Sequence, residues 1–294
     1  MVPGVSRHPE WLRVRVRASP EAERSAQVLA ALGVDTVCRS AHCPNSYDCL
    51  GRGTATFMIL GTRCTRDCRF CAVPAGSPSA ADPGEPDRIA EAAARLGLTH
   101  VVVTSVTRDD LRDGGASHFA AVLRAVRRRL AKATVEVLVP DFGGDEGALE
   151  ALLPSPPDVF GHNVETVPRL YRTMRPGAGY ERSLRLLREA HAWRDVRTKS
   201  GLMLGLGETE AEVLQVMAEL RQAKCDMLTI GQYLPPSRRH LPIARLVPPE
   251  KFAELAAVAR DLGFAAVAAG PLVRSSYRAA ALLAEAAGSS SARD

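Results

Sequence analysis

Three cysteines stand close together in the run Cys64-Thr-Arg-Asp-Cys68-Arg-Phe-Cys71. Three thiolates provide only three of the four ligands that a tetrahedral zinc ion or a [4Fe–4S] cube uses. Zinc sites usually combine two short Cys or His arms, and a single CxxC arm, Cys68 to Cys71, is present here. The run therefore favours an iron–sulfur cube with one open iron, which can bind a substrate or a cofactor.

A second group of cysteines lies upstream, where four residues separate Cys38 from Cys43 and five separate Cys43 from Cys49. This group is another three-thiolate site that needs a fourth ligand from elsewhere. The seventh cysteine, Cys225, stands alone at the entry to an apolar stretch, where a small buried side chain is the favoured interpretation. The fourth ligand of the second site is therefore predicted not to be a thiolate.

The length and composition agree with one enzyme domain. The chain has 294 residues and 46% hydrophobic content, and α/β barrels reach this length as a single unit. No apolar run approaches the length of a membrane span, and the N-terminus lacks the apolar segment of a secretory signal. Because thiols kept as cluster ligands suit a reducing compartment, we expect a cytoplasmic protein that does not use a membrane.

The charge is mildly basic, at +5, and 34 of the 38 basic residues are arginine. The densest group, Arg127 to Arg129, has no accompanying nucleic-acid-binding motif, so a solvated helix face is the preferred interpretation and no nucleic acid is expected as a partner. The positive charge would help to dock an acidic carrier protein.

The pattern of apolar residues predicts the elements that must position the cysteines. Short runs rich in β-branched residues predict strands at 56–60, 101–104, 135–139, 159–161, 197–204 and 228–233, with 264–268 as a candidate seventh. Helical periodicity fills the gaps, as at 209–221 and 249–262. This alternation predicts parallel strands in a βα sheet or barrel. Active sites of such barrels use the loops after the strands, which is where Cys64 lies.

Taken together, these motifs resemble the lipoyl synthases, a family of radical S-adenosylmethionine enzymes. The resemblance runs from about residue 10 to about residue 285 and departs from the family pattern at Asp48, Leu50, Thr107 and Arg112. It is carried by both cysteine groups and by Gly53–Gly61, Arg108–Ala116, His162–Thr166, Lys199–Glu208 and the run Arg274-Ser-Ser-Tyr277.

The resemblance implies a division of the chain into three parts. These are an N-terminal extension with the auxiliary cluster motif at 1–53, a partial (β/α)6 TIM-type barrel of the radical S-adenosylmethionine type at 54–270, and a C-terminal segment at 271–294. We expect the end of that segment, from Gly288 onward, to be a disordered tail.

The same resemblance implies the reaction. Two sulfur atoms would be inserted at C6 and C8 of an octanoyl group carried on a protein lysine, giving the lipoyl cofactor. These C–H bonds are not acidic and carry no leaving group, so a radical supplied by a cofactor has to remove the hydrogen atom. The cluster on Cys64, Cys68 and Cys71 would cleave S-adenosyl-L-methionine to a 5′-deoxyadenosyl radical. A second [4Fe–4S] cluster, on Cys38, Cys43 and Cys49, would be consumed as the sulfur source.

The resemblance also implies partners and further site residues. The partners would be an octanoylated lipoyl carrier protein or lipoyl domain, an electron donor such as ferredoxin or flavodoxin, and an iron–sulfur cluster carrier for repair. Contacts to the cofactor or substrate are expected at Phe70, Thr104, Ser105, Asn163, Glu165, Arg175 and Lys199.

Ser276 is the residue that the resemblance implies as fourth ligand of the second cluster, with Ser275 as the fallback. A serine oxygen binds these clusters less well than thiolate does, which suits a cluster that must surrender sulfur. Spacing alone favours a different interpretation, in which Ser276 caps a helix beginning at Tyr277.

Several other residues have competing interpretations. The glycine-rich stretch Gly201–Glu208 lacks the Gly-Lys-Ser/Thr signature of a phosphate loop, so a strand edge beside adenine is preferred. His42 is either a donor to a cluster sulfur or an exposed loop residue. Asp109 and Asp110 are adjacent in sequence, so we expect loop contacts or salt bridges instead of an acid–base pair.

Two other functions are considered. A methylthiotransferase-like radical enzyme would also carry two clusters, but it would require additional RNA-binding sequence. An electron carrier would complete each cluster with four cysteines, which seven cysteines cannot do twice.

Overall fold

The computed structural model describes residues 9–13, 20–41, 43–51, 54–145, 147–152, 154–193 and 195–290. The chain divides into two compact units, which are described separately. The N-terminal unit comprises residues 14–67 and 72–160, and the C-terminal unit comprises 1–13, 68–71 and 161–294. His42, for which a contact to a cluster sulfur was considered, lies outside the described residues.

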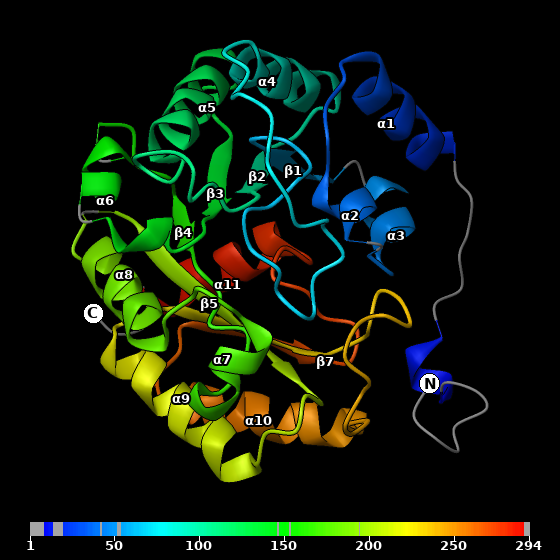
Figure 1. Cartoon of the computed structure of the whole chain (residues 1–294), viewed down its shortest axis with the longest axis vertical. Helices are drawn as coiled ribbons and strands as arrows, with labels where there is room; N and C mark the ends of the chain where they lie inside the picture. Colours follow the sequence, from blue (N-terminus) through cyan, green and yellow to red (C-terminus); the bar gives the residue numbers. More distant parts are fainter. Residues whose placement is uncertain are drawn as a thin grey trace. The chain divides into compact units, whose positions relative to one another are not determined.

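The elements follow one another along the chain as alternating strands and helices (Figure 1). The N-terminal unit contains α1 (Pro20–Ala31), α2 (Val37–Ser40), α3 (Ser46–Gly51), β1 (Thr56–Ile59), α4 (Glu85–Arg95), β2 (His100–Ser105), α5 (Ala116–Arg129), β3 (Thr134–Leu138), η2 (Phe142–Gly144) and α6 (Gly147–Leu152). Strand β4 (Val159–Gly161) stands at the boundary. The C-terminal unit contains η1 (Glu10–Leu12), η3 (Pro168–Leu170), α7 (Tyr171–Met174), α8 (Tyr180–His191), β5 (Arg197–Leu204), α9 (Glu210–Gln222), β6 (Met227–Gln232), α10 (Pro249–Asp261), β7 (Ala266–Gly270) and α11 (Ala279–Ser290).

Within the described residues, seven strands form one sheet in the order β1-β2-β3-β4-β5-β6-β7. The pairs β1–β2, β2–β3, β5–β6 and β6–β7 are parallel, as strands joined by crossover helices must be. This order confirms the predicted α/β partial barrel of the TIM type. Six strands fall within two residues of their predicted positions, and β7 is the candidate seventh strand, beginning two residues later than predicted.

The strands of the N-terminal unit are buried because helices cover them. All four residues of β1 are buried, and Val101 and Val103 of β2 are inaccessible to solvent. Helix α4 packs on α5, and α5 packs on α6 (Figure 1). The last turn of α5 carries Arg127, Arg128 and Arg129, which lie 3.3, 3.3 and 3.0 Å from the carboxylates of Asp158, Asp87 and Glu91. This ion-paired surface confirms that the arginine cluster is a solvated helix face.

Cys225 of the C-terminal unit lies in its apolar core, at the entry to β6. Its side chain is fully buried, and its thiol donates a hydrogen bond to the carbonyl of Met227 at 3.3 Å. Burial raises the pKa of this thiol to about 12, with a smaller contribution from the neighbouring Asp226. The prediction that Cys225 is a small buried side chain is therefore confirmed.

The segment after β7 packs closely on β6, within the same unit. The amide of Gln232 donates to the carbonyl of Pro271 at 3.3 Å, and the carbonyl of Val273 occupies the space where a side chain on Gly231 would lie. Helix α11 then begins at Ala279 and continues to Ser290, which corrects the predicted disordered tail for residues 288–290. Residues 291–294 lie outside the described residues. Across the described part of the chain, no helix combines the length and the apolar character needed to cross a bilayer.

We predict that Gly231→Ala destabilises the protein and displaces the segment that follows β7. The added methyl group would meet the carbonyl of Val273, and overpacking of this kind costs about 1–3 kcal/mol. Urea unfolding measures the loss, and hydrogen exchange of residues 271–277 measures the displacement. Gly288→Ala is the matched control, because it adds a methyl group in open space on α11 and should be neutral or slightly stabilising. Equal stability of the two variants would contradict this close packing.

Candidate functional site

The upstream cysteines are gathered by two short helices of the N-terminal unit. Cys38 lies in α2, Cys49 lies in α3, and Cys43 lies between them, with its amide bonded to the carbonyl of Cys38 at 3.0 Å. The amide of Cys49 donates to the carbonyl of Asn45, a buried residue, at 2.9 Å. The side chain of Ser25 on α1 donates to the carbonyl of Leu50, which fastens α3 to α1.

The three thiols are close enough to influence one another electrostatically. Burial and, after it, the negative charges that Cys38 and Cys43 would carry together raise the pKa of Cys49 to about 12. All seven cysteines of the chain are present as thiols. Among the described residues, no three His, Cys, Asp or Glu side chains are already arranged to hold a metal ion. The chemistry of the donor set, three thiols, is nevertheless that of an iron–sulfur cluster site, and bound iron would balance the charge of the ionised sulfurs.

Cys64 follows β1 and is held by two backbone amides. The amides of Arg66 and Thr107 donate to its sulfur at 3.4 and 3.3 Å, and its own amide donates to the carbonyl of Pro74 at 2.9 Å. Hydrogen bonds to sulfur are among the features that set the reduction potential of iron–sulfur clusters. This local environment therefore fits a cluster ligand.

Arg66, inside the cysteine run, connects the loop to the ends of the next two strands. Its guanidinium makes a bidentate contact with Asp109 at 2.7 and 2.8 Å and reaches Asp141 at 2.7 Å. The Arg66 side chain is 8% exposed and that of Asp141 is 0% exposed. Burial lowers the pKa of Arg66, but the hydrogen bonds to both carboxylates outweigh it and raise the pKa above its ordinary value. Arg66 is therefore a permanent cation that positions the loop.

The other two cysteines of this run belong to the C-terminal unit, where they form a turn. The amide of Cys71 donates to the carbonyl of Cys68 at 3.0 Å, and the amide of Arg69 donates to the carbonyl of Met174. Phe70 packs against an apolar cluster that includes Met174 and Tyr233. The structure thus gives Phe70 a packing role that holds the turn.

Three residues predicted to contact the cofactor or substrate meet after β4. The Asn163 side-chain amide donates to Glu165 at 3.0 Å, and Arg175 donates to the backbone carbonyls of Asn163 and Val164 at 2.9 and 3.3 Å. Glu165 has a left-handed backbone, with φ of +65°, which is costly for a non-glycine residue and is found most often at functional sites. Gly201 on β5 gives Asn163 room, because a Cβ there would lie 2.7 Å from its side-chain oxygen.

Burial and the neighbouring polar groups shift the pKa of Glu165 in opposite directions. Burial raises the pKa of Glu165 above its ordinary value, although Arg175, the amide of Asn163 and Arg274 each lower it. Arg274 belongs to the Arg-Ser-Ser-Tyr run, so that run lies within electrostatic reach of Glu165. The next residue, Ser275, accepts a hydrogen bond from the Asn163 amide at 2.5 Å. The structure thus joins two motifs that are far apart in the sequence.

Ser276 is not the cap of a helix that begins at Tyr277. Helix α11 begins at Ala279, and the residue before it, Arg278, has a left-handed φ of +53°. The carbonyl of Ser276 accepts a hydrogen bond from the amide of Ala279 at 3.3 Å, as part of the turn that precedes the helix. The interpretation that spacing alone favoured is therefore wrong.

The remaining predicted contacts lie on β2 and β5. Thr104 and Ser105 end β2; Thr104 donates to the carbonyl of Leu138 at 2.8 Å, whereas the buried Ser105 hydroxyl has no hydrogen-bond partner among the described residues. A buried hydroxyl without a partner is expected to bind something that the protein alone does not provide. Lys199 is buried and is paired with Met227, the first residue of β6, which places it well before the carboxyl end of β5.

The glycine-rich turn after β5 is closed by its own glutamate. The carboxylate of Glu208 accepts hydrogen bonds from the amides of Gly205 and Leu206 at 2.7 and 2.8 Å. These amides are the donors that a phosphate would require, so the turn is not a phosphate loop, in agreement with the preferred interpretation.

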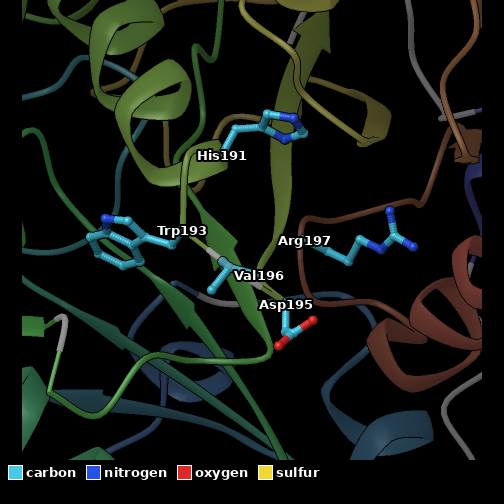
Figure 2. Close-up of a pocket in the computed structure, with 5 residues that line it drawn as sticks. All are labelled: His191, Trp193, Asp195, Val196 and Arg197. Atoms are coloured by element: carbon cyan, nitrogen blue, oxygen red, sulfur yellow. The ribbon is translucent and has the colours of Figure 1, made fainter.

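A shallow pocket lies at the opposite end of β5, where α8 leads into the strand (Figure 2). The side chains of Trp193 and Arg197 extend away from one another there. Active sites of parallel α/β barrels use the carboxyl ends of strands, so this pocket is not the reaction site.

Comparison with known proteins identifies the family. The family model of the Radical SAM superfamily matches residues 58–220. A lipoyl synthase of Methylococcus capsulatus is 58% identical over 278 residues, covering 93% of this chain and 85% of that protein. A lipoyl synthase of Caldanaerobacter subterraneus is 56% identical over 274 residues, covering 93% and 96%. The chain belongs to the lipoyl synthase family. Like its relatives it is a radical S-adenosylmethionine enzyme that depends on [4Fe–4S] clusters.

Solved structures support the fold at low sequence identity. HydG, a maturase of the [FeFe]-hydrogenase, gives a TM-score of 0.59 at 15% identity and covers 72% of this chain and 50% of its own. Streptococcus suis SuiB bound to S-adenosylmethionine gives 0.52 at 13%, covering 74% and 51%. The chain thus spans about half the length of these proteins, and the likeness shows the fold alone.

Two residues that position the loop containing Cys64 in this lipoyl synthase family member, Arg66 and Asp141, were not predicted from the sequence. Asp109 and Asp110 were expected to be salt-bridge partners, and both are, with Arg66 and Arg108 respectively. Asp141 was not predicted, because it lies on a loop after a different strand and no spacing connects it to Arg66. The available signal for Arg66 was its position between Cys64 and Cys68, two of the predicted cluster ligands.

We predict that Arg66→Ala weakens cluster binding and folding together. It leaves the buried Asp141 without its guanidinium partner, and breaking a buried pair in this way costs about 3–5 kcal/mol. The measurements are urea unfolding of the protein before iron is added and iron per chain after reconstitution. Iron is counted in a background where Cys38, Cys43 and Cys49 are alanine, so that it reports the first site alone.

Arg63→Ala is the control for this experiment, because Arg63 lies one residue before Cys64 and is exposed. It should bind iron and unfold like the parent protein. If Arg66→Ala also retained parental iron content and stability, the positioning role of Arg66 would be refuted.

Proposed function

We propose that this chain inserts two sulfur atoms at C6 and C8 of an octanoyl group attached to a lysine of a carrier protein, and so forms the lipoyl cofactor. The observation that carries the proposal is the second cysteine group, which α2 and α3 gather into one electrostatically coupled set of thiols. Radical cleavage of S-adenosyl-L-methionine needs one cluster. A second three-thiol site is expected if an additional cluster supplies the sulfur atoms.

Cys64, Cys68 and Cys71 are proposed to hold the cluster that binds S-adenosyl-L-methionine. When bound, the cluster and the cofactor supply the one-electron chemistry that removes hydrogen from an unactivated carbon. The protein supplies the positions of the ligands. Arg66 fixes the loop at Cys64, and two backbone amides point at the sulfur of that cysteine.

The cofactor contacts are proposed at the carboxyl ends of the strands. Ser105 offers a buried hydroxyl that needs a partner, beside Thr104. Asn163 and Glu165 offer an amide and a carboxylate that can bind hydroxyl groups, while Arg175 positions the segment that carries them. Phe70 holds the cysteine turn by packing. A contact from Lys199 to the cofactor or substrate stays a prediction, because Lys199 lies near the start of β5 and not at its carboxyl end.

Cys38, Cys43, Cys49 and Ser276 are proposed to hold the second cluster, which is the sulfur substrate. Ser275 is less suitable as the fourth ligand because its hydroxyl is bonded to the Asn163 amide at 2.5 Å. An oxygen ligand is bound less firmly than thiolate and can be released when the cluster gives up sulfur. In this proposal residues 1–53 form the auxiliary extension, 54–270 the barrel and 271–294 the segment that supplies the serine.

The partners follow from the reaction. The substrate is an octanoylated lipoyl domain or carrier protein. A ferredoxin or flavodoxin would supply electrons, and an iron–sulfur carrier would rebuild the consumed cluster. A reducing compartment, the cytoplasm, suits thiols that must remain free to bind iron.

An anaerobic single-turnover assay tests the function. The fully reconstituted enzyme is mixed with an octanoyl-lysyl peptide and S-adenosyl-L-methionine, and iron and sulfide are counted before and after. We expect product that carries two sulfur atoms from the enzyme and loss of the second cluster. Product without enzyme-derived sulfur, or a protein that accepts only one cluster, would overturn the proposal.

We predict that Ser276→Ala cleaves S-adenosyl-L-methionine at close to the normal rate but forms no lipoyl product, because the second cluster lacks its fourth ligand. Ser276→Cys should hold the cluster more firmly and slow the release of sulfide. Ser275→Ala is the comparison for cluster content: it removes the hydrogen bond to the Asn163 amide but no proposed ligand, so it should keep the iron and sulfide of the second cluster after reconstitution. Normal lipoyl yield from Ser276→Ala would remove Ser276 from the ligand set.

A further inference from the structure

The segment 233–248, here called the β6 loop, follows β6 in the C-terminal unit and is held in place by a glutamine. The side-chain amide of Gln232 donates to the carbonyls of Leu204 and Arg245, both at 3.1 Å, and its oxygen accepts from the amide of Val247 at 2.9 Å. Because Gln232 is fully buried, these bonds are shielded from water. The start and the end of the β6 loop are therefore fixed.

The inner side of the β6 loop is apolar and packs against the cysteine turn. Tyr233 and Ile243 are buried in a cluster with Met174, against which Phe70 of the turn also packs. The hydroxyl of Tyr233 donates to the carbonyl of Leu241 at 2.8 Å, which draws the loop back over its own start. The β6 loop and the turn Cys68–Cys71 therefore form one packed structure.

His240 ties the tip of the β6 loop to a cluster-ligand residue. Its Nε2 lies 2.9 Å from the carbonyl of Cys71, and a carbonyl only accepts, so Nε2 carries the proton. Nδ1 of His240 lies 2.9 Å from the side-chain hydroxyl of Ser237. The backbone carbonyl of Ser237 also accepts a hydrogen bond from the backbone amide of His240. These contacts fix the two residues between Ser237 and His240, which are Arg238 and Arg239.

Arg238 and Arg239 point a concentrated positive charge outward. Both are exposed, and neither forms an ion pair within the described part of the chain, nor does the exposed Arg69 of the cysteine turn. Their own stretch cannot neutralise them, since no Asp or Glu occurs from 227 to 249.

Arginines elsewhere on the surface are partly ion-paired and partly not. On the outer helices and their connections, ion pairs include Arg88–Asp82, Arg95–Glu91, Arg128–Asp87, Arg129–Glu91 and Arg169–Glu212. Exposed Arg124, Arg188 and Arg260 have no ion pair within the described residues, and each lies on a different helix. What distinguishes Arg69, Arg238 and Arg239 is that they lie on the packed structure formed by the cysteine turn and the β6 loop, next to the predicted cluster ligands Cys68 and Cys71.

We propose that Arg69, Arg238 and Arg239, here called the basic rim, dock an acidic protein surface, namely that of the domain which carries the octanoyl group. This inference rests on the proposed function and identifies how its substrate is recognised. Guanidinium groups bind carboxylates in bidentate pairs, and charges at the edge of an interface accelerate encounter with a partner of opposite sign. A loop that is rigid before binding loses little entropy when the partner arrives.

The observations favour a protein over a nucleic acid as the partner. Binding of single-stranded nucleic acid relies on exposed aromatic side chains that stack on bases. The tyrosine of the β6 loop, Tyr233, is 1% exposed, and no other aromatic residue occurs in the loop. Carboxylates are therefore the groups that the basic rim is suited to bind.

The test compares two doubly charge-reversed enzymes. Arg238→Glu/Arg239→Glu alters the basic rim, and Arg185→Glu/Arg188→Glu alters two exposed arginines on α8; each lowers the net charge from +5 to +1. The Kd of an octanoylated acidic lipoyl domain for the reconstituted enzyme is measured by calorimetry without S-adenosylmethionine, so that no turnover occurs. Single turnover of a neutral octanoyl-lysyl peptide is measured in parallel.

We expect reversal in the basic rim to raise the Kd of the acidic domain about tenfold at low salt, with a smaller effect at high salt, and to leave peptide turnover nearly unchanged. The α8 variant should bind the domain like the parent. Equal weakening by both variants would show a net-charge effect and overturn the proposal, as would unchanged binding by the rim variant or an equal loss of peptide turnover.

Two further outcomes are distinguishable. If an RNA oligonucleotide binds the parent enzyme, and the rim variant loses RNA binding but keeps the acidic domain, the partner is a nucleic acid and the proposal fails. If the parent enzyme does not convert the peptide at all, the proposed function fails, whereas the Kd comparison still decides whether the basic rim docks the domain.

Discussion

Three thiols that lie close enough to influence one another repel once they ionise, so binding at the second cysteine group depends on iron to balance the charge. The effect is visible at Cys49, where burial and the neighbouring cysteines raise the pKa to about 12. Helix α3, which carries Cys49, is fastened to α1 by the hydrogen bond from Ser25 to the carbonyl of Leu50. Metal binding and folding are coupled for the same reason, since the ligands are ionised by the metal that they bind.

The first cysteine loop is held by a different device, a buried ion pair. Arg66 is bonded to two carboxylates, and one of them, Asp141, is wholly buried. A buried pair adds little net stability compared with apolar packing, so its value lies in specifying one geometry. The arrangement fixes Cys64 from the protein side and leaves its sulfur to receive amide hydrogen bonds. Positive charge is used inside the unit for positioning and, at the basic rim, for recognition.

The sequence predicted most of the fold because apolar runs and helical periodicity are local signals. Local sequence was enough to predict the six strands, the seventh candidate strand and the burial of Cys225. The pairing of Arg66 with Asp141 could not be read, since it joins loops that follow different strands. The helix cap at Ser276 was wrong for a related reason: local propensity favoured a start at Tyr277, but residues 275–278 form a turn that ends in the left-handed Arg278, so the helix begins at Ala279.

Ser275 and Ser276 are adjacent and have the same side chain, but they have different neighbours. Ser275 is bonded to Asn163, which also holds Glu165, so this serine links the C-terminal segment to the polar group after β4. The backbone of the next residue, Ser276, takes part in the turn that precedes α11. If Asn163 and Glu165 contact the cofactor as proposed, the segment that supplies Ser276 is positioned through the cofactor site. Loss of the Asn163 amide would then act on both clusters' chemistry, whereas loss of Ser276 would act on one.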